Sequence, residues 1–189
     1  MTSTKKSYFD EIYRDDADPW QFETSPYEKR KYAITMASLP RLRYASAFEP
    51  GCSVGVLSEQ LASRCDHVLA TDFIAPALQR AQDRLKDLPH VTVQEGSIPD
   101  DWPAGPFDLV VLSEIGYYFD EVDLVRIVTL VLGSTLPGAH LVGVHWRGDT
   151  NYALSGDRVH EVITSCSGLS RCVQHEEDEF VLGVWERSH

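Results

Sequence analysis

Residues 49–55 read Glu-Pro-Gly-Cys-Ser-Val-Gly and lie between an apolar run and a helical pattern. Asp72 closes the next apolar run of the chain. Glycines let the backbone approach a ligand without a Cβ in the way, and a carboxylate at the next strand end can hold a ribose diol through charge-assisted hydrogen bonds. A strand, a glycine turn, a helix and a strand that ends in an acid together predict a pocket for an adenosyl group.

Strand and helix patterns alternate along the chain on both sides of this turn. We expect five core strands, at residues 44–48, 67–71, 91–93, 107–112 and 141–144. The helix before the last of these strands should have one apolar face, which is formed by Val122, Val125, Val128 and Leu132. Pro137-Gly138 should form the turn between that helix and the strand. Such alternation favours a parallel sheet that helices cover on both faces.

The last part of the chain departs from this alternation. A helical pattern from Asp157 to Cys166 precedes two strand patterns, at residues 171–175 and 180–185. Only about four residues separate these strands, whereas a parallel pair needs a crossover of about a dozen, so they must form an antiparallel hairpin. The predicted fold class is α/β: a Rossmann-like doubly wound sheet, mostly parallel, with a C-terminal antiparallel hairpin.

The segment before the first strand carries two helical patterns. One surrounds residues 9–13 and precedes an irregular turn. The other begins at Ser25, which suits the N-cap, and Pro26 suits the first helical position. Glu28 is placed for the reciprocal contact of a capping box. We therefore expect ordered helices here rather than a flexible tail.

Length and composition fit one domain over residues 1–189, with a helical N-terminal cover at 1–43 and the Rossmann-like core at 44–189. The 17 basic against 29 acidic residues leave a net charge of -12, which repels phosphate backbones and anionic lipids, so neither nucleic acid nor a membrane is an expected partner. No apolar run reaches the roughly 18 residues of a membrane helix, and no signal peptide is visible, so we expect a cytoplasmic protein. The four cysteines lack metal-ligand spacing, which predicts free thiols and no metal site.

The order of these patterns resembles the class I S-adenosylmethionine-dependent methyltransferases over residues 44–189. The NodS-like branch, whose nodulation member methylates an amino-sugar nitrogen, is similar in the motifs Asp18-Pro19-Trp20, Pro26-Tyr27-Glu28, the 49–55 stretch, and Ser113-Glu114 with Tyr117-Tyr118. The resemblance implies S-adenosylmethionine as the cofactor and a small-molecule acceptor, an amine or an amino sugar.

The same resemblance implies which residues meet the cofactor. Asp72 would hold the ribose hydroxyls, Phe73 and Ile74 would flank the adenine, and residues 96–98 would meet the adenine edge. The methionine portion would lie against Glu49 and the two glycines of the turn. Trp20, Lys31 and Ser113 are further candidates, and the full predicted cofactor set is Trp20, Lys31, Glu49, Gly51, Gly55, Asp72, Phe73, Ile74, Gly96, Ser97, Ile98 and Ser113.

Two positions depart from the family pattern. Ser53 stands where many relatives have glycine, and Ser97 stands where many have an aspartate that accepts from the adenine amino group. A serine hydroxyl can still accept that hydrogen bond, but it is neutral and the bond is weaker. Cofactor identity is therefore better defined by the sequence than cofactor affinity.

Several of these residues have an alternative interpretation. Trp20 would cover the sulfonium through a cation–π contact, or would instead staple the leader to the core. Either Arg30 or Lys31 would reach the cofactor carboxylate, or both would be solvated helix charges. The glycines of the 49–55 turn would admit a ligand, or would only allow close packing of strand against helix.

The chemistry predicts few catalytic residues, because the sulfonium supplies the reactivity and the protein has to align a nucleophile. An amine must first lose a proton, and the candidate catalytic residues at strand ends are Glu114 and His145. Glu114 would otherwise be a helix-start acid, and His145 a hydrogen-bonded strand end. Flat surfaces for the acceptor would come from Tyr117, Tyr118 and Trp146.

Three other functions stay open at this point: a small-molecule O-methyltransferase, a nicotinamide-dependent oxidoreductase, and a noncatalytic adenosyl-binding protein. The oxidoreductase should show G-x-G-x-x-G spacing, which Gly51-x-x-x-Gly55 does not fit. Product formation would separate the enzymes from the binding protein.

Overall fold

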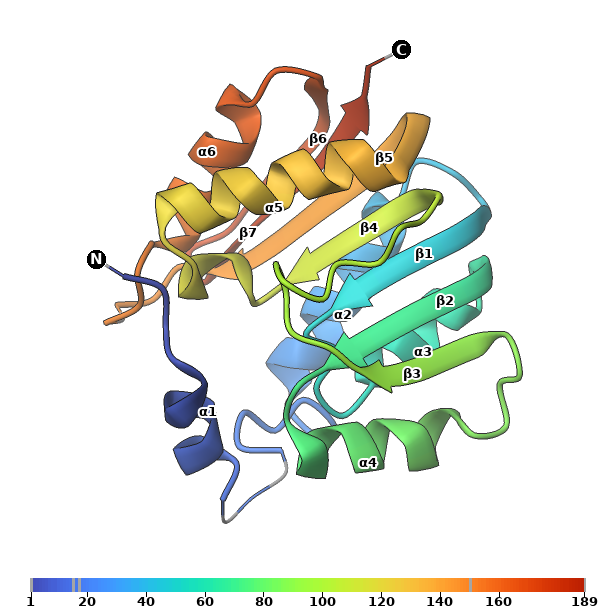
Figure 1. The fold of residues 1–189 in the computed structure, drawn as a ribbon, viewed down its shortest axis with the longest axis vertical. Coiled ribbons are helices and arrows are strands. Elements are labelled where there is room, and N and C mark those ends of the chain that lie inside the picture. Colours follow the sequence, from blue (N-terminus) through green and yellow to red (C-terminus); the bar gives the residue numbers. More distant parts are fainter. Residues whose placement is uncertain (1, 15, 17, 150, 189) are drawn as a thin grey trace. The chain divides into compact units, whose positions relative to one another are not determined.

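A computed structural model of the chain describes residues 2–14, 16, 18–149 and 151–188 (Figure 1). The chain divides into two compact units, Lys5–Ser97 and a second unit of Met1–Thr4 with Ile98–His189. Each unit is described by itself, and the expectation of one domain over residues 1–189 stays a prediction. None of the helices in the described residues combines the length and the apolarity that a bilayer crossing requires.

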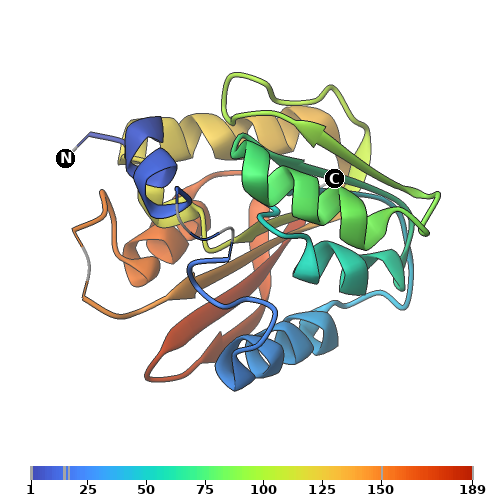
Figure 2. The ribbon, with the colours of Figure 1, turned by 90° about the horizontal axis from the view of Figure 1, so that it is seen from below.

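The unit Lys5–Ser97 contains a three-stranded parallel sheet in the order β3-β2-β1 (Figure 1). Helices α3 and α4 pack against β2, and α4 also packs against β3; the two helices lie side by side in Figure 2. Every expected strand and helix of this unit is present. Their bounds are α1 (Lys6–Ile12), α2 (Pro26–Ser38), β1 (Tyr44–Pro50), α3 (Val56–Ala62), β2 (Cys65–Asp72), α4 (Ala75–Leu85) and β3 (Val91–Glu95).

Helix α2 begins as the sequence predicts, with one correction. Ser25 is the N-cap, its hydroxyl accepts from the Glu28 N–H, and Pro26 is the first helical residue. The Ser25 N–H, which the reciprocal half of a capping box would bind, donates to the Gln21 carbonyl at 2.9 Å. The Glu28 carboxylate accepts instead from Lys31, one turn further along the helix.

The second unit contains β4 and β5 as a parallel pair, followed by the antiparallel pairs β5–β7 and β7–β6. The predicted C-terminal hairpin is thereby confirmed. Helices α5 and α6 contact each other and both pack against β5. The elements are β4 (Phe107–Ser113), η1 (Gly116–Tyr118, a 3₁₀ turn), α5 (Glu121–Ser134), β5 (Thr135–Trp146), α6 (Gly156–Ser165), β6 (Leu169–Glu176) and β7 (Phe180–Arg187).

Two sequence predictions in this unit are wrong. Of the predicted apolar face of α5, Val122 and Val125 are exposed, by 78% and 46%, and Leu132 is half-buried. Only Val128 is buried, on a face that also holds Leu124, Ile127 and Val131. Pro137-Gly138 is not a turn between elements, because β5 already begins at Thr135. The register of β4 against β5 shifts there, because Phe107 pairs with Thr135 and Leu109 pairs with His140.

The Trp185 side chain packs over the middle of the β5–β7 pair. Gly143 and Gly183 are directly opposite each other in the two strands. A Cβ on Gly183 would lie 2.5 Å from the Trp185 ring, and one on Gly143 would lie 3.1 Å from it. Trp185 is fully buried, and its Nε1 donates to the Thr164 hydroxyl on α6. Because neither glycine has a side chain, the Trp185 indole can pack directly against the backbone of both strands.

Candidate functional site

The predicted cofactor turn at residues 49–55 is left-handed at three positions. Gly51, Ser53 and Gly55 have φ of 72°, 46° and 78°, a region that favours glycine. The Gly51 and Cys52 N–H groups both donate to the Thr71 carbonyl of β2, at 2.7 and 3.0 Å. A Cβ on Gly55 would lie 3.1 Å from the Ala81 Cβ of α4. At Gly55 the glycine thus serves both the turn and close helix packing.

Asp72, at the end of β2, is buried and ties two loops together. One carboxylate oxygen accepts from the Ser53 N–H and the other from the Ile74 N–H, both at 2.9 Å. Burial raises the pKa of Asp72, and the backbone N–H groups that it accepts from work in the opposite direction. Each carboxylate oxygen can accept more than one hydrogen bond, so the group that organises the turn can also accept from ribose hydroxyls.

Glu49, at the end of β1, is a second buried carboxyl beside the turn. Its Oε2 accepts from the Ser58 hydroxyl of α3 at 2.5 Å. Burial raises the pKa of Glu49 to about 7, and the negative charge of Asp72 adds to the increase. A cation placed next to Glu49 would therefore favour its ionised form.

The leader packs onto this turn through a hydrophobic cluster that includes Tyr13, Trp20, Phe73 and Ile74. The Tyr13 hydroxyl is 2.8 Å from the Ser53 hydroxyl, and the Tyr13 ring meets the Trp20 ring edge-on at 5.4 Å. Trp20 is half-buried within the cluster, an arrangement that fits the staple interpretation. The sequence analysis did not assign Tyr13 to the site, although its aromatic helical pattern in the leader was visible.

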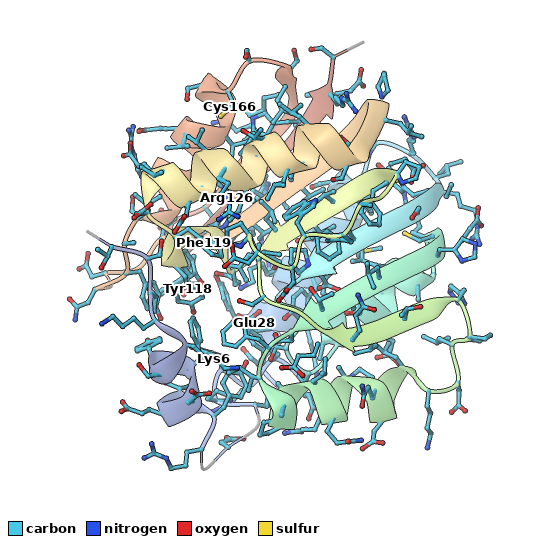
Figure 3. The ribbon with its side chains drawn as sticks, in the orientation of Figure 1. Lys6, Glu28, Tyr118, Phe119, Arg126 and Cys166 are labelled. Atoms are coloured by element: carbon cyan, nitrogen blue, oxygen red, sulfur yellow. The ribbon has the colours of Figure 1, made fainter. Side chains whose placement is uncertain are left out.

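The residues predicted to meet the adenine directly follow β2 and β3. Ile74 is buried and Phe73 is half-buried. The ammonium of Lys6, which is labelled on α1 in Figure 3, lies 5.3 Å from the Phe73 ring centre. The Gly96 N–H donates to the Asp72 carbonyl at 3.1 Å, and Ser97 is exposed.

Lys31 of α2 is buried and is not a solvated helix charge. Its ammonium donates to Glu28 Oε1 at 2.9 Å and lies 4.8 Å from the Tyr27 ring centre. Arg30, by contrast, is exposed. A buried ion pair holds its geometry well, because separating the charges would leave each desolvated without a partner. Contact of Lys31 with a cofactor carboxylate stays a prediction.

The second unit gathers the predicted acceptor residues around Glu114, which directly follows β4. Glu114 has φ of 57°, a left-handed conformation that costs a non-glycine residue about 1–2 kcal/mol. Its Oε2 accepts from the Tyr117 hydroxyl at 2.5 Å and from the Trp146 N–H at 3.0 Å. Strain of this kind persists where surrounding bonds fix the residue, and it is common at functional sites. Ser113, just before Glu114, is the last residue of β4, and Ile98, the first residue of the segment Ile98–His189, is half-buried.

Aromatic side chains surround this carboxylate. Tyr117 stacks on Tyr152 with ring centres 5.0 Å apart, and Tyr118 meets both rings edge-on. Tyr118 and Phe119 follow each other on the loop between β4 and α5 (Figure 3). Trp146 is 38% exposed and its ring covers Gly148, where a Cβ would lie 2.0 Å from the indole. Tyr152 was missed by the sequence analysis, because no pattern marks the loop that carries it.

His145 lies inside β5 and has no exposed surface. Its Nε2 accepts from the Gly116 N–H at 3.1 Å, and its Nδ1 is 3.1 Å from Nε2 of His160 on α6. This is the hydrogen-bonded strand residue that the sequence allowed as the alternative to a base. His160 was not predicted, because nothing in the helical pattern of α6 marks a buried histidine as part of a network.

The fold places the chain among known proteins. The crystal structure of the N-methyltransferase NodS from Bradyrhizobium japonicum WM9, in complex with S-adenosyl-L-homocysteine, has a TM-score of 0.84 at 22% identity and covers 97% of this chain and 98% of that chain. A Pseudomonas syringae protein provisionally assigned as a methyltransferase is 41% identical, with a TM-score of 0.77, and covers 85% of this chain and 99% of that one. The fold is that of the class I methyltransferases.

Sequence comparison narrows the class to a family. The family model of nodulation protein S (NodS) matches residues 7–136. Nodulation protein S of Rhizobium tropici is 30% identical over 127 residues, which are 66% of this chain and 53% of that protein. The chain belongs to the NodS family, and it spans about half the length of the curated relatives it matches.

Proposed function

We propose that the protein is an S-adenosylmethionine-dependent methyltransferase that methylates the nitrogen of a small amine, with amino sugars as the acceptor class. The observation that carries the proposal is Asp72, whose buried carboxylate joins the left-handed turn at Ser53 to Ile74. A family relative that is an N-methyltransferase crystallised with S-adenosyl-L-homocysteine supports both the cofactor and the nitrogen acceptor. The proposed setting is the cytoplasm, without nucleic acid or membrane partners, in keeping with the net charge of -12.

The residues of the unit Lys5–Ser97 fit this cofactor. Asp72 keeps lone pairs for the ribose hydroxyls, and Glu49, with its pKa raised to about 7, is suited to a neighbouring α-ammonium group. Bound S-adenosylmethionine would supply a sulfonium methyl group that the nucleophile attacks in line, with S-adenosyl-L-homocysteine as the leaving thioether. The protein's part is to hold the reactants in line and keep water out, which is the larger share of catalysis for such a reaction.

The acceptor proposal rests on Glu114 and the tyrosines beside it. A carboxylate next to aromatic faces is a suitable place for a protonated amine, because both attract a cation. The amine must then lose its proton to expose a lone pair, and Glu114 is the group we assign to accept it. Of the two predicted bases, Glu114 serves the proposal better, since His145 is buried with both ring nitrogens hydrogen-bonded. Tyr117, Tyr118 and Trp146 would supply the flat surfaces for the sugar.

Calorimetry followed by product analysis tests this proposal. We expect S-adenosyl-L-homocysteine to bind and NAD not to bind. With S-adenosylmethionine, glucosamine and its β1,4-linked oligomers should gain a methyl group on nitrogen, detected by mass and by fragmentation. Methylation of hydroxyls but never of amines would favour the O-methyltransferase, NAD binding would favour the oxidoreductase, and binding without any product would favour the adenosyl-binding protein.

A further inference from the structure

Two buried histidines link the interior of the second unit to the loop between β4 and α5, which carries Tyr117. The Gly116 N–H donates to His145 Nε2, and His145 Nδ1 is 3.1 Å from His160 Nε2. The two imidazole rings are nearly perpendicular, with centres 5.2 Å apart, and the His160 ring lies 5.2 Å from the Trp185 ring. The chain of contacts therefore runs from the sheet core to the first residue of η1.

The direction of these hydrogen bonds fixes where the protons lie. A ring nitrogen that accepts from a backbone N–H carries no proton, so neutral His145 must carry its proton on Nδ1. His160 Nε2 lies within hydrogen-bond distance of that proton and must be bare in order to accept it. Burial, followed by the neighbouring His145, lowers the pKa of His160 to about 2, so His160 is neutral and able to accept. The other charged groups that act on His160 are Asp157, Arg171 and Arg147.

Gly116 is tightly fitted against the first histidine. A Cβ at this position would lie 2.5 Å from His145 Nε2 and 2.7 Å from Val159 of α6. Gly116 begins η1, and the next residue, Tyr117, donates its hydroxyl to Glu114 and packs edge-on against the His145 ring. A change in the protonated nitrogen of His145 would turn an acceptor into a second donor facing the Gly116 N–H.

We propose that His145 and His160 are a positioning pair: His160 fixes the tautomer of His145, and His145 holds Gly116 and thereby the Tyr117–Glu114 hydrogen bond that prepares the acceptor site. His145 is then not the base that removes the proton from the amine. The effect on turnover rests on the proposed function, whereas the tautomer does not.

The tautomer is measured directly by long-range ¹H–¹⁵N NMR of the full-length protein. We expect His145 protonated on Nδ1 and bare on Nε2, His160 neutral, and a Gly116 amide coupled to an imidazole nitrogen. A His145 that carries its proton on Nε2 overturns the proposal, whether or not any acceptor is found.

Substitution of His160 separates positioning from mere packing. The side-chain oxygen of Gln in His160→Gln can accept from His145 Nδ1–H and should keep the tautomer and most of the turnover with glucosamine oligomers. His160→Leu removes the acceptor and should lower kcat about tenfold, the scale of one lost hydrogen bond, with S-adenosyl-L-homocysteine affinity within about twofold. His175→Leu, a half-exposed histidine of β6, is the matched control and should change neither.

The outcomes distinguish this proposal from the proposed function. Equal loss in His160→Gln and His160→Leu with an unchanged His145 tautomer overturns it, as does unchanged turnover in His160→Leu. If no amine is methylated by the native protein, the proposed function fails, and the NMR comparison of native, His160→Gln and His160→Leu proteins still decides the positioning pair. Should His160→Leu not fold, the native tautomer and His160→Gln supply the answer.

Discussion

The two units build their sites from different materials. In Lys5–Ser97 the candidate site is formed mainly by the main chain, because a left-handed turn brings the Ser53 N–H to Asp72, which also accepts from the Ile74 N–H. In the second unit side chains hold each other, from His160 through His145 to the loop that carries Tyr117 and Glu114. Main-chain geometry requires glycine and a strand-end acid at fixed positions, so it can be recognised in a sequence, whereas a side-chain network cannot.

Glu114→Ala should have the largest effect, a loss of methylation rate, and should leave the binding of S-adenosyl-L-homocysteine nearly unchanged. Removing the proposed proton acceptor is expected to lower the rate of amine methylation about 100-fold or more, the usual range for a general base. Affinity for S-adenosyl-L-homocysteine, measured by calorimetry, should stay within about twofold. Glu114→Gln keeps an acceptor for the Tyr117 hydroxyl and the Trp146 N–H, and should restore folding stability without restoring rate. A large loss of cofactor affinity would contradict this separation of roles.

Asp72→Ala should do the reverse and act on the cofactor. Loss of hydrogen bonds to a charged group predicts roughly 10- to 150-fold weaker binding of S-adenosyl-L-homocysteine. Asp72→Asn keeps an acceptor for one backbone N–H, so its affinity for S-adenosyl-L-homocysteine should lie between those of the native and the Asp72→Ala proteins. Calorimetry measures the affinity, and circular dichroism checks that each variant is folded. A folded Asp72→Ala protein with native affinity would remove Asp72 from the site.

Tyr13→Phe tests whether the hydrogen bond between the Tyr13 and Ser53 hydroxyls also stabilises the turn at residues 49–55. Losing the buried contact with Ser53 should lower the free energy of unfolding by about 0.5–1.5 kcal/mol and speed cofactor dissociation about threefold. Ser53→Ala has the same left-handed strain and removes the other partner, so a double-mutant cycle isolates the bond. Urea unfolding and stopped-flow dissociation are the measurements. Additive effects of the two substitutions would show that the hydroxyls do not interact in solution.

The smallest effect concerns a proton at Glu49. Because its pKa is raised to about 7, Glu49 is largely protonated at pH 6, and a bound α-ammonium group would favour the ionised form. Binding should therefore release a fraction of a proton at pH 6, and affinity should fall as pH drops below about 7. Calorimetry in buffers of different ionisation enthalpy measures the release. Glu49→Gln should abolish it and Glu11→Gln, an exposed control on α1, should not. Equal release in all three proteins would assign the proton elsewhere.

The sequence predicted the fold, the C-terminal hairpin and the family, and the structure and comparisons confirm these. It predicted the wrong face of α5 because that helix is apolar on nearly all sides, so periodicity could not distinguish Val125 from Leu124. His145 looked like a strand-end base because the strand was expected to stop at Val144, whereas β5 continues to Trp146. Contacts between residues far apart in the chain, such as His145 with His160 or Tyr13 with Ser53, leave no mark in local patterns.

Trp185 and the two glycines beneath it constrain how this sequence can drift over generations. With the indole in place, an alanine Cβ at position 183 would lie 2.5 Å from the ring, so this substitution arriving first would be selected against, whereas a Cβ at position 143 would lie 3.1 Å from the ring and would need only a small shift of it. A smaller side chain at position 185 arriving first would leave a cavity instead, costing about 3–5 kcal/mol. Positions 183 and 185 should therefore change only through intermediates that are less fit than either end. Among descendants of this chain, they should be inherited together or replaced together.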